Sequence, residues 1–375
     1  MNNIATSERV HIAIFGNCNS GKSSLLNALA QQSVAVVSDV AGTTTDIVQK
    51  SIELPNVGAA LLIDTPGLDD KTELGTLRTA QSYKALAKAD IAIVLLPVEE
   101  DFLQRLQTLE IPTILVQSKC DIDRPSAQSN AIAVSSTTGE GIDTLLNAIA
   151  AAVTTDTRYI TEGICSTGDT VLLVMPQDGS APKGRLIKPQ VEVIRELLDR
   201  GCTPVCCQPA GMAAALAALS AHPKAIITDS SAFAAVKPLV PQGVTLTSFS
   251  ILFARYKGDI ELFREGAKVL LSLCPTARIL IAEACSHTPQ NEDIGRVKLP
   301  RILRKKLGDE ITIDTVSGAD FPTDLTPYDI LIHCGACMFT RRYVLSRIAQ
   351  TKAQGVAMTN YGVAIAALLG IETDK

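Results

Sequence analysis

Tryptophan is absent from this chain of 375 residues, and aromatic residues make up only 4% of it. Because 46% of the residues are hydrophobic, the cores must be built mainly from Ala, Ile, Leu and Val. The sequence has no run of about 18 apolar residues, the minimum for a membrane-spanning helix. Residues 1–9 are polar and lead directly into a predicted strand, which argues against a signal peptide. We therefore expect a cytoplasmic globular protein that makes no contact with a membrane.

Long basic runs are also missing, and the formal net charge is −5. The densest basic segment, Arg301–Lys306, is soon followed by Asp309 and Glu310. We interpret this segment as a solvated helix face, and we expect no nucleic-acid partner. In a cytoplasmic chain, ten cysteines favour metal binding or redox chemistry over a disulfide framework.

The length of the chain predicts two or three domains. Between residues 9 and 150, short β-type runs alternate with helical stretches, which predicts an α/β domain with a parallel sheet and helices on both faces. A stretch rich in Thr, Ser and Gly then loses this periodicity, and two further alternating α/β units follow. We predict a first domain over residues 1–155, a linker over 156–168, a second domain over 169–250 and a third over 251–375.

The first domain carries a phosphate-binding motif. Residues 16–23 fit the pattern G-x-x-x-x-G-K-[ST], between a predicted strand and a helix that begins at Lys22. Glycines let backbone N–H groups wrap the phosphates, and the helix N-terminus adds partial positive charge. In this motif Lys22 contacts the β- and γ-phosphates, and the Ser23 hydroxyl ligates Mg²⁺. The residues predicted to bind the nucleotide here are Gly16, Asn19, Ser20, Gly21, Lys22, Ser23 and Ser24.

Three further motifs occur in the order that a guanine-nucleotide site requires. They are D-T-P-G at 64–67, S-K-C-D at 118–121 and S-S-T at 135–137. Asp64 can hold the Mg²⁺ shell, and Asp121 can accept two hydrogen bonds from guanine that adenine cannot offer. Together the motifs predict a site for GTP and Mg²⁺. The residues predicted to bind the nucleotide or its Mg²⁺ here are Asp64, Gly67, Lys119, Asp121, Ser135 and Ser136.

This ordered set resembles the translation-factor-like GTPases, particularly the branch of the tRNA-modifying and ribosome-assembly GTPases, over about residues 9–150. The resemblance implies a switch I at residues 42–46, in which Thr44 caps Mg²⁺. It also implies that Asn19 coordinates K⁺, because potassium-activated members place an Asn at this position. The alternative for Asn19 is an ordinary turn residue.

Two departures from the pattern bear on affinity and catalysis. The base-reading motif usually begins with Asn, whereas Ser118 offers fewer hydrogen bonds, so we expect guanine selectivity through Asp121 with modest affinity. No Gln follows the motif at 64–67 to orient water, and Glu73 is either a substitute for it or a solvated residue at a helix start. We expect slow hydrolysis, typical of a switch, with Lys22, Thr44 and Glu73 as the candidate catalytic residues.

Cysteine and histidine gather in two short segments of the third domain. Cys285-Ser286-His287 follows one predicted strand, and His333-Cys334-Gly335-Ala336-Cys337 ends another. Adjacent ends of parallel strands converge on one crevice. A third thiolate beside a C-x-x-C pair suits a soft metal ion or an iron–sulfur cluster. Three cysteines leave one iron of a four-iron cluster open to a His, to water or to an incoming ligand.

Other interpretations of the cysteines stay open at this point. A structural Zn²⁺ bound by three Cys and one His is chemically sensible, and so are plain buried cysteines at loop ends. Four further cysteines lie in apolar surroundings, and we interpret them as core residues. They are Cys202, Cys206, Cys207 and Cys274.

The pattern Cys-x-His followed by His-Cys-x-x-Cys, behind a GTPase-like domain, resembles the [FeFe]-hydrogenase maturation GTPases. Residues 181–187, 246–258 and 294–298 also look like that family, so the resemblance covers essentially the whole chain. It implies a GTPase domain, a dimerisation domain and a cluster-binding domain, in a homodimer. It further implies a [4Fe–4S] cluster on three cysteines with a histidine as fourth ligand or neighbour. The residues concerned are Cys285, Cys334, Cys337, His287 and His333.

The same resemblance implies a scaffold or carrier for the diiron subcluster of the hydrogenase active site. Two radical-SAM maturases would supply its parts, and apo-[FeFe]-hydrogenase would receive it. From the residues themselves, we expect switch movements to change access to the open iron or affinity for a partner. The main alternative is a Zn²⁺-stabilised regulatory GTPase that acts in ribosome or tRNA metabolism. An enzyme doing radical chemistry is disfavoured, because the C-x-x-x-C-x-x-C motif is absent.

Overall fold

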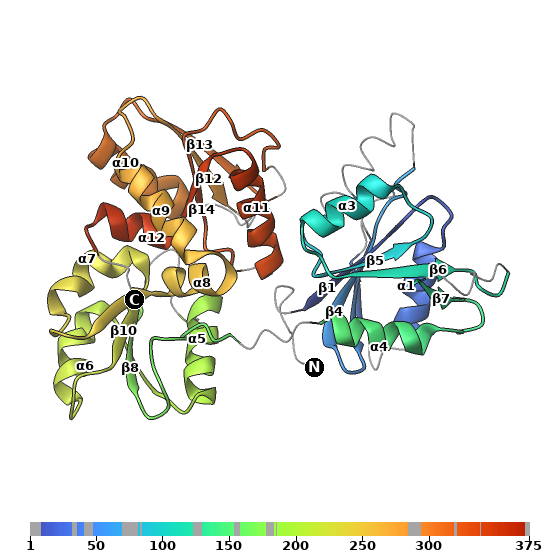
Figure 1. The fold of residues 1–375 in the computed structure, drawn as a ribbon. Helices are drawn as coiled ribbons and strands as arrows, with labels where there is room; N and C mark the ends of the chain where they lie inside the picture. The colour runs from blue at the N-terminus through green and yellow to red at the C-terminus, as the bar shows by residue number, and fades with distance from the viewer. Residues whose placement is uncertain are drawn as a thin grey trace. The chain divides into compact units, whose positions relative to one another are not determined.

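In the computed structural model the chain forms two compact units, Met1–Asp156 and Thr157–Lys375 (Figure 1). In the residues that the structure describes, no helix combines the length and the apolar character needed to cross a membrane. The described residues are 9–31, 36–40 (backbone only), 48–69, 82, 85–122, 130–153, 158–177, 184, 186–283, 294–318, 321–337 and 339–371.

The first unit contains, within its described residues, a seven-stranded sheet in the order β2-β3-β4-β1-β5-β6-β7. Strands β4, β1, β5, β6 and β7 run parallel, whereas β3 pairs antiparallel with both β2 and β4. The strands are β1 (Val10–Gly16), β2 (Val36–Val40), β3 (Val48–Leu54), β4 (Gly58–Asp64), β5 (Ile91–Leu95), β6 (Thr113–Ser118) and β7 (Ile132–Val134). The helices are α1 (Lys22–Gln31), α3 (Glu100–Thr108) and α4 (Ile142–Ala152).

Both faces of this sheet are buried, which explains why its central strands are almost continuously apolar. Side chains of α1 and α4 pack on one face, around Ile12 and Leu62. The other face, around Phe15 and Val94, packs against α3 and against Ala85 and nearby residues. The carboxyl ends of the parallel strands are therefore the open edge at which a ligand can bind.

The second unit begins with a four-stranded parallel sheet in the order β11-β10-β8-β9. Helices α5 and α8 pack on one face of it, and α6 and α7 pack on the other. The strands are β8 (Thr170–Val174), β9 (Thr203–Cys207), β10 (Ala225–Thr228) and β11 (Thr245–Ser248). The helices are α5 (Lys188–Asp199), α6 (Met212–Ala218), α7 (Phe233–Val236) and α8 (Phe249–Lys257).

A second four-stranded parallel sheet completes this unit, in the order β13-β12-β14-β15. Helix α8 lies between the two sheets and contacts α5 as well as α11 and α12 (Figure 1). The strands are β12 (Arg278–Glu283), β13 (Thr312–Ser317), β14 (Ile330–His333) and β15 (Ala357–Asn360). The helices are α9 (Ile260–Leu271), α10 (Leu299–Leu307), α11 (Arg341–Ala353) and α12 (Tyr361–Leu368).

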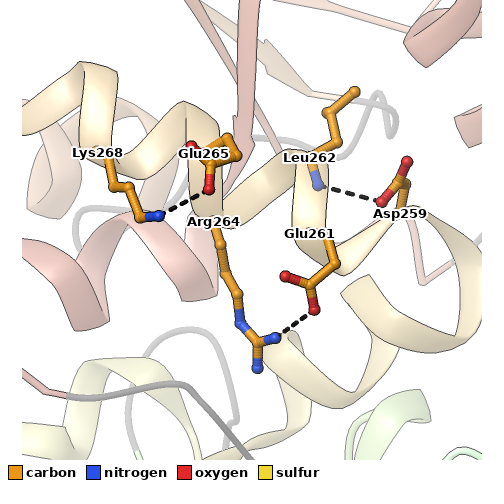
Figure 2. Close-up of polar contacts among 6 residues, drawn as sticks. All are labelled: Asp259, Glu261, Leu262, Arg264, Glu265 and Lys268. Atoms are coloured by element: carbon orange, nitrogen blue, oxygen red, sulfur yellow. Dashed lines mark hydrogen bonds and ion pairs between the residues drawn. The ribbon is translucent and has the colours of Figure 1, made fainter.

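Helix α9 shows how the sequence fixes a local element. The side chain of Asp259 caps its N-terminus by accepting the N–H of Leu262 at 3.1 Å. Two further pairs at i,i+3 spacing, Glu261 with Arg264 and Glu265 with Lys268, lie along its exposed side (Figure 2). The opposite side presents Phe263, Ala267 and Leu270 to the core.

The predicted fold class is confirmed, with two corrections. The strands β2 and β3, which pair antiparallel with each other, were not expected. The alternation of strands and helices predicts parallel pairing, and it does not reveal two consecutive strands joined without a helix. The interpretation of four cysteines as core residues is wrong for Cys206 and Cys274, which are exposed. Cys206 lies on the edge strand β9, where apolar neighbours in sequence do not imply burial.

Candidate nucleotide and cysteine sites

The phosphate loop joins the end of β1 to α1. Lys22 is 8% exposed, and its ammonium group donates to the carbonyls of Gly16 at 3.0 Å and Asn17 at 2.7 Å. Burial lowers the pKa of Lys22, and the nearby Asp64 carboxylate opposes that shift. A buried cation that bonds only to carbonyls of its own loop is placed to exchange them for phosphate oxygens.

A second group of polar atoms meets at the end of β4. The Ser23 hydroxyl donates to Asp64 Oδ2 at 2.5 Å. Asp64 Oδ1 and the Ser20 hydroxyl are both buried and have no hydrogen-bond partner among the described residues. Burial raises the pKa of Asp64, partly offset by the Ser23 hydrogen bond. Orphaned buried oxygens beside a lysine fit a Mg²⁺–phosphate group, which would satisfy them.

The turn after β4 lies against the phosphate loop. A Cβ atom at Gly67 would come within 2.3 Å of Cys18 Sγ and 2.9 Å of its backbone nitrogen, so only glycine fits there. Asp69, which the sequence motifs did not single out, accepts the Cys18 N–H at 2.6 Å. That hydrogen bond lowers the pKa of Asp69. Asp69 therefore occupies one of the loop N–H groups in this state.

The base-reading segment is joined to the phosphate loop by two hydrogen bonds. The Ser118 hydroxyl donates to the Ser20 carbonyl at 2.6 Å, and Lys119 Nζ donates to the Asn19 carbonyl at 2.8 Å. Asn19 has a φ of +59°, as a turn residue can. Asp121, the third residue beyond Ser118, is exposed at the open edge of the sheet, where it can meet a purine.

Ser135 and Ser136, both predicted to bind the nucleotide, differ in their hydrogen bonds in the turn after β7. The N–H of Ser135 donates to the Glu140 carbonyl at 2.9 Å, and its hydroxyl accepts the N–H of Thr138 at 3.1 Å. Ser135 therefore shapes the turn. The backbone N–H of Ser136 makes no hydrogen bond with the residues that the structure describes. The predicted contact of this N–H with a guanine oxygen stays a prediction.

Four predicted site residues lie outside the described residues. They are Thr44, Glu73, Cys285 and His287.

The two cysteine-bearing segments follow neighbouring strands of one sheet. Strands β12 and β14 pair in parallel, with Ala282 opposite His333, and the Cys334 N–H donates to the Ala282 carbonyl at 2.9 Å. Cys285 comes two residues after Glu283, the last residue of β12. Cys334 and Cys337 are both partly exposed at this edge. Across the described residues, no group of three or more His, Cys, Asp and Glu side chains is placed to hold a metal ion.

The ring of His333 is buried and both of its nitrogens have protein partners. Nδ1 lies 2.6 Å from the Cys334 carbonyl, and Nε2 lies 2.8 Å from the guanidinium of Arg347. Burial, together with the Arg347 charge, lowers the pKa of His333 to about 3. The neutral ring therefore donates from Nδ1 and accepts at Nε2. Arg347 also bonds to Tyr343 and to the Gly318 carbonyl at 3.0 Å.

The loop between the two cysteines is held from several sides. Ala336 has a φ of +47°, which is unusual for a residue other than glycine, and its N–H donates to Cys334 Sγ at 3.5 Å. The side-chain amide of Asn360 donates to the Cys334 carbonyl at 3.4 Å. Sequence reasoning missed Arg347 and Asn360, because neither lies in a motif and both come from elements later in the chain.

Comparison with protein-family models accounts for almost the whole chain. A 50S ribosome-binding GTPase model matches residues 11–119, the hydrogen maturase F dimerization domain matches 160–258, and the hydrogen maturase F tetramerization domain matches 261–373. The chain belongs to the hydrogen maturase F family. It joins a GTPase domain to the dimerization and tetramerization domains of that family.

The curated relatives match little more than a third of this hydrogen maturase F chain. The tRNA modification GTPase MnmE of Neisseria meningitidis is 37% identical over 153 residues, which cover 37% of this chain and 34% of the relative. The same protein of Methylorubrum populi is 34% identical over 147 residues, which cover 37% and 31%. The chain thus spans about a third of the length of these relatives.

Solved structures with likeness to the chain include two GTPases. Era from Aquifex aeolicus bound to GDP and AlF4⁻ is 25% identical, covers 38% of this chain and 56% of its own, and has a TM-score of 0.32. The G domain of the FeoB iron transporter from T. maritima is 25% identical, covers 39% and 99%, and has a TM-score of 0.29. At these TM-scores the likeness adds nothing to the family assignment.

Proposed function

We propose that this protein is a cytoplasmic, GTP-dependent scaffold that holds a [4Fe–4S] cluster and delivers the diiron precursor to apo-[FeFe]-hydrogenase. The proposed cluster ligands are Cys285, Cys334 and Cys337. Family membership supports the hydrogenase connection. The observation that supports the cluster is the pairing of β12 with β14, because in the sequence Cys285 comes two residues after β12 and Cys334 directly follows β14.

The donor chemistry fits the proposed cluster. Thiolates at C-x-x-C spacing are the usual ligands of iron–sulfur clusters, and Cys334 and Cys337 lie partly exposed on a loop that backbone contacts hold. The cluster would supply an iron with an open coordination position. We assign His333 to positioning the loop, since both of its ring nitrogens bond to other groups. His287, water or an incoming ligand is then left for the open position.

The nucleotide site is assigned to the residues that meet at the edge of the first sheet. Lys22 would bind the phosphates, and Ser23 with Asp64 and Thr44 would hold Mg²⁺. Asp121 would select guanine. Asn19 would coordinate K⁺ and so stimulate hydrolysis. With Glu73 in place of a water-orienting Gln, we propose that hydrolysis is slow.

The role of GTP is to gate assembly without touching the cluster. Phosphate and Mg²⁺ contacts hold the switch segments of such GTPases, and hydrolysis releases them. We propose that this change alters affinity for two radical-SAM maturases and for apo-[FeFe]-hydrogenase. Equal affinities for these partners with GTP and with GDP would leave the gating unsupported.

Activation of purified apo-[FeFe]-hydrogenase tests the proposal. The protein, loaded by the two maturases, should restore hydrogen evolution, and the Cys334→Ser variant should restore less than about a tenth of it, since a lost ligand weakens cluster binding. Cys274→Ser is the matched control, because Cys274 is exposed and precedes the amino end of β12, whereas the proposed ligands follow the carboxyl ends of β12 and β14. Activation by Cys334→Ser at the level of this control would refute the carrier role.

No specific observation favours the alternative function, a Zn²⁺-stabilised GTPase of tRNA metabolism. The MnmE relatives match 37% of the chain, whereas residues 160–258 and 261–373 match domains named for hydrogen maturase F.

A further inference from the structure

A lysine at the end of α8 is buried against the cysteine loop. Lys257 is 6% exposed, and its ammonium group donates to three main-chain carbonyls. The acceptors are Ala336 at 3.0 Å, Cys337 at 3.3 Å and Phe339 at 2.8 Å. The same ammonium lies 5.3 Å from the centre of the Phe253 ring, one helical turn earlier.

Burying the charged ammonium group of Lys257 costs free energy of desolvation. An ammonium group taken out of water must regain its hydrogen bonds, and three of them go to neutral oxygens of one short loop. The loop needs such support, because Ala336 is in the left-handed region of backbone space. The contact also crosses a domain boundary, since Lys257 falls in the segment matched by the dimerization model and the loop falls in the next one.

We propose that Lys257 is a positioning residue for the proposed cluster: it fixes the Cys334–Cys337 loop and sets the reduction potential through its charge. The inference rests on the proposed function, because it assumes that the two cysteines are cluster ligands. Its geometric basis is the carbonyl contact to Cys337 itself. A nearby positive charge stabilises the more negative, reduced state of a cluster, so it raises the reduction potential.

A purely structural lysine would hold the loop without affecting redox behaviour, and a set of substitutions separates the two roles. Lys257→Met keeps the length but removes charge and donors. Lys257→Gln keeps donors without charge, and Lys257→Arg keeps both. The matched control is Lys268→Met on α9, whose side chain is 72% exposed and pairs with Glu265 (Figure 2).

The experiment uses the full chain, reconstituted anaerobically with iron and sulfide. The first measurement is the rate of iron release to an excess of chelator, and the second is the midpoint potential by dye-mediated titration with EPR detection. Amide exchange of residues 334–340 in the metal-free protein gives a third measurement that does not depend on the cluster.

For Lys257→Met we expect iron release about 10–100-fold faster than in the parent, as for other residues that orient metal ligands. We expect faster amide exchange in the loop and a midpoint potential shifted to a more negative value. Lys257→Gln should show the same shift in potential with a smaller effect on iron release, while Lys257→Arg and Lys268→Met should match the parent.

Three results would overturn the inference. A midpoint potential unchanged in both Lys257→Met and Lys257→Gln would remove the electrostatic role, and unchanged iron release and exchange would remove the positioning role. An equal shift in Lys268→Met would show that any lost charge suffices. If Lys257→Met does not fold, Lys257→Gln and Lys257→Arg decide between the same outcomes. A parent protein that binds no iron and sulfide would instead refute the proposed function.

Discussion

Replacement of Gly266 by Ala tests the packing of α9 on the sheet that carries the cysteine loop. A Cβ atom at this position would lie 2.0 Å from the Met358 carbonyl oxygen and 3.1 Å from the Thr359 nitrogen, whereas 3.4 Å or more is an ordinary contact. These atoms belong to the backbone of β15, so no side-chain rotation relieves the overlap. Helix α9 must move away from the strand by more than about 1 Å.

Two opposing effects determine how much Gly266→Ala changes the free energy of local opening. Gly→Ala in a helix interior favours the helix by about 1 kcal/mol. Overpacking costs about 1–3 kcal/mol or more, and a shift of a whole helix lies at the upper end of that range. We therefore expect a net loss of about 2 kcal/mol in the free energy of opening, which corresponds to roughly 30-fold less protection from amide exchange.

Hydrogen exchange with mass spectrometry on the full chain can locate this loss in α9 and β15. Glu265→Ala, at the residue next to Gly266, is the matched control. The Glu265 side chain is 69% exposed, and its replacement removes only the pairing with Lys268, worth about 0.3 kcal/mol. Protection in α9 and β15 equal to or greater than that of the parent would refute the close approach of Gly266 to Met358.

Two further predictions concern ionisable groups. Burial raises the pKa of Asp64, so its contribution to stability is present at low pH and is lost as the pH rises through that pKa. Asp64→Asn should therefore raise the melting temperature of the nucleotide-free protein at neutral pH, yet weaken Mg²⁺-dependent GTP binding by roughly 10–150-fold; a lower melting temperature with unchanged binding would count against the assigned site. Burial also raises the pKa of Cys165 to about 11, and its sulfur lies 3.6 Å from that of the buried Cys202. At pH 8, iodoacetamide should label the exposed Cys274 well before Cys165, with labelling of Cys165 rising up to about pH 11; equal rates in peptide mass spectrometry would contradict its burial.

The nucleotide-site motifs and the fold class were the parts most accessible from the sequence. A phosphate loop must join a strand to a helix, and D-T-P-G must follow a strand, so both could be placed on the sheet before the structure was known. The pairing of β12 with β14, the two strands that precede the cysteine segments, followed in the same way, because neighbouring parallel strands end on one edge of a sheet.

The supporting residues could not be predicted in this way. Lys257 reaches the cysteine loop from α8, which lies between the two sheets, whereas Asn360 reaches it from the end of the neighbouring strand β15 and Arg347 bonds from α11 to the adjacent His333. Only tertiary packing brings these three side chains there. The sequence around each of these three residues is typical of an ordinary helix or of a strand end. Asp69 is likewise visible only once the turn after β4 folds back on the phosphate loop.

The most direct test of the central claim is the iron, zinc and acid-labile sulfide content of the anaerobically purified protein, beside a Cys334→Ala/Cys337→Ala variant. We predict about four irons and four sulfides per chain, as in a [4Fe–4S] cluster, and their loss in the variant. Stoichiometric zinc without sulfide, persisting after reconstitution with iron and sulfide, would contradict the account and leave a GTPase with a structural metal.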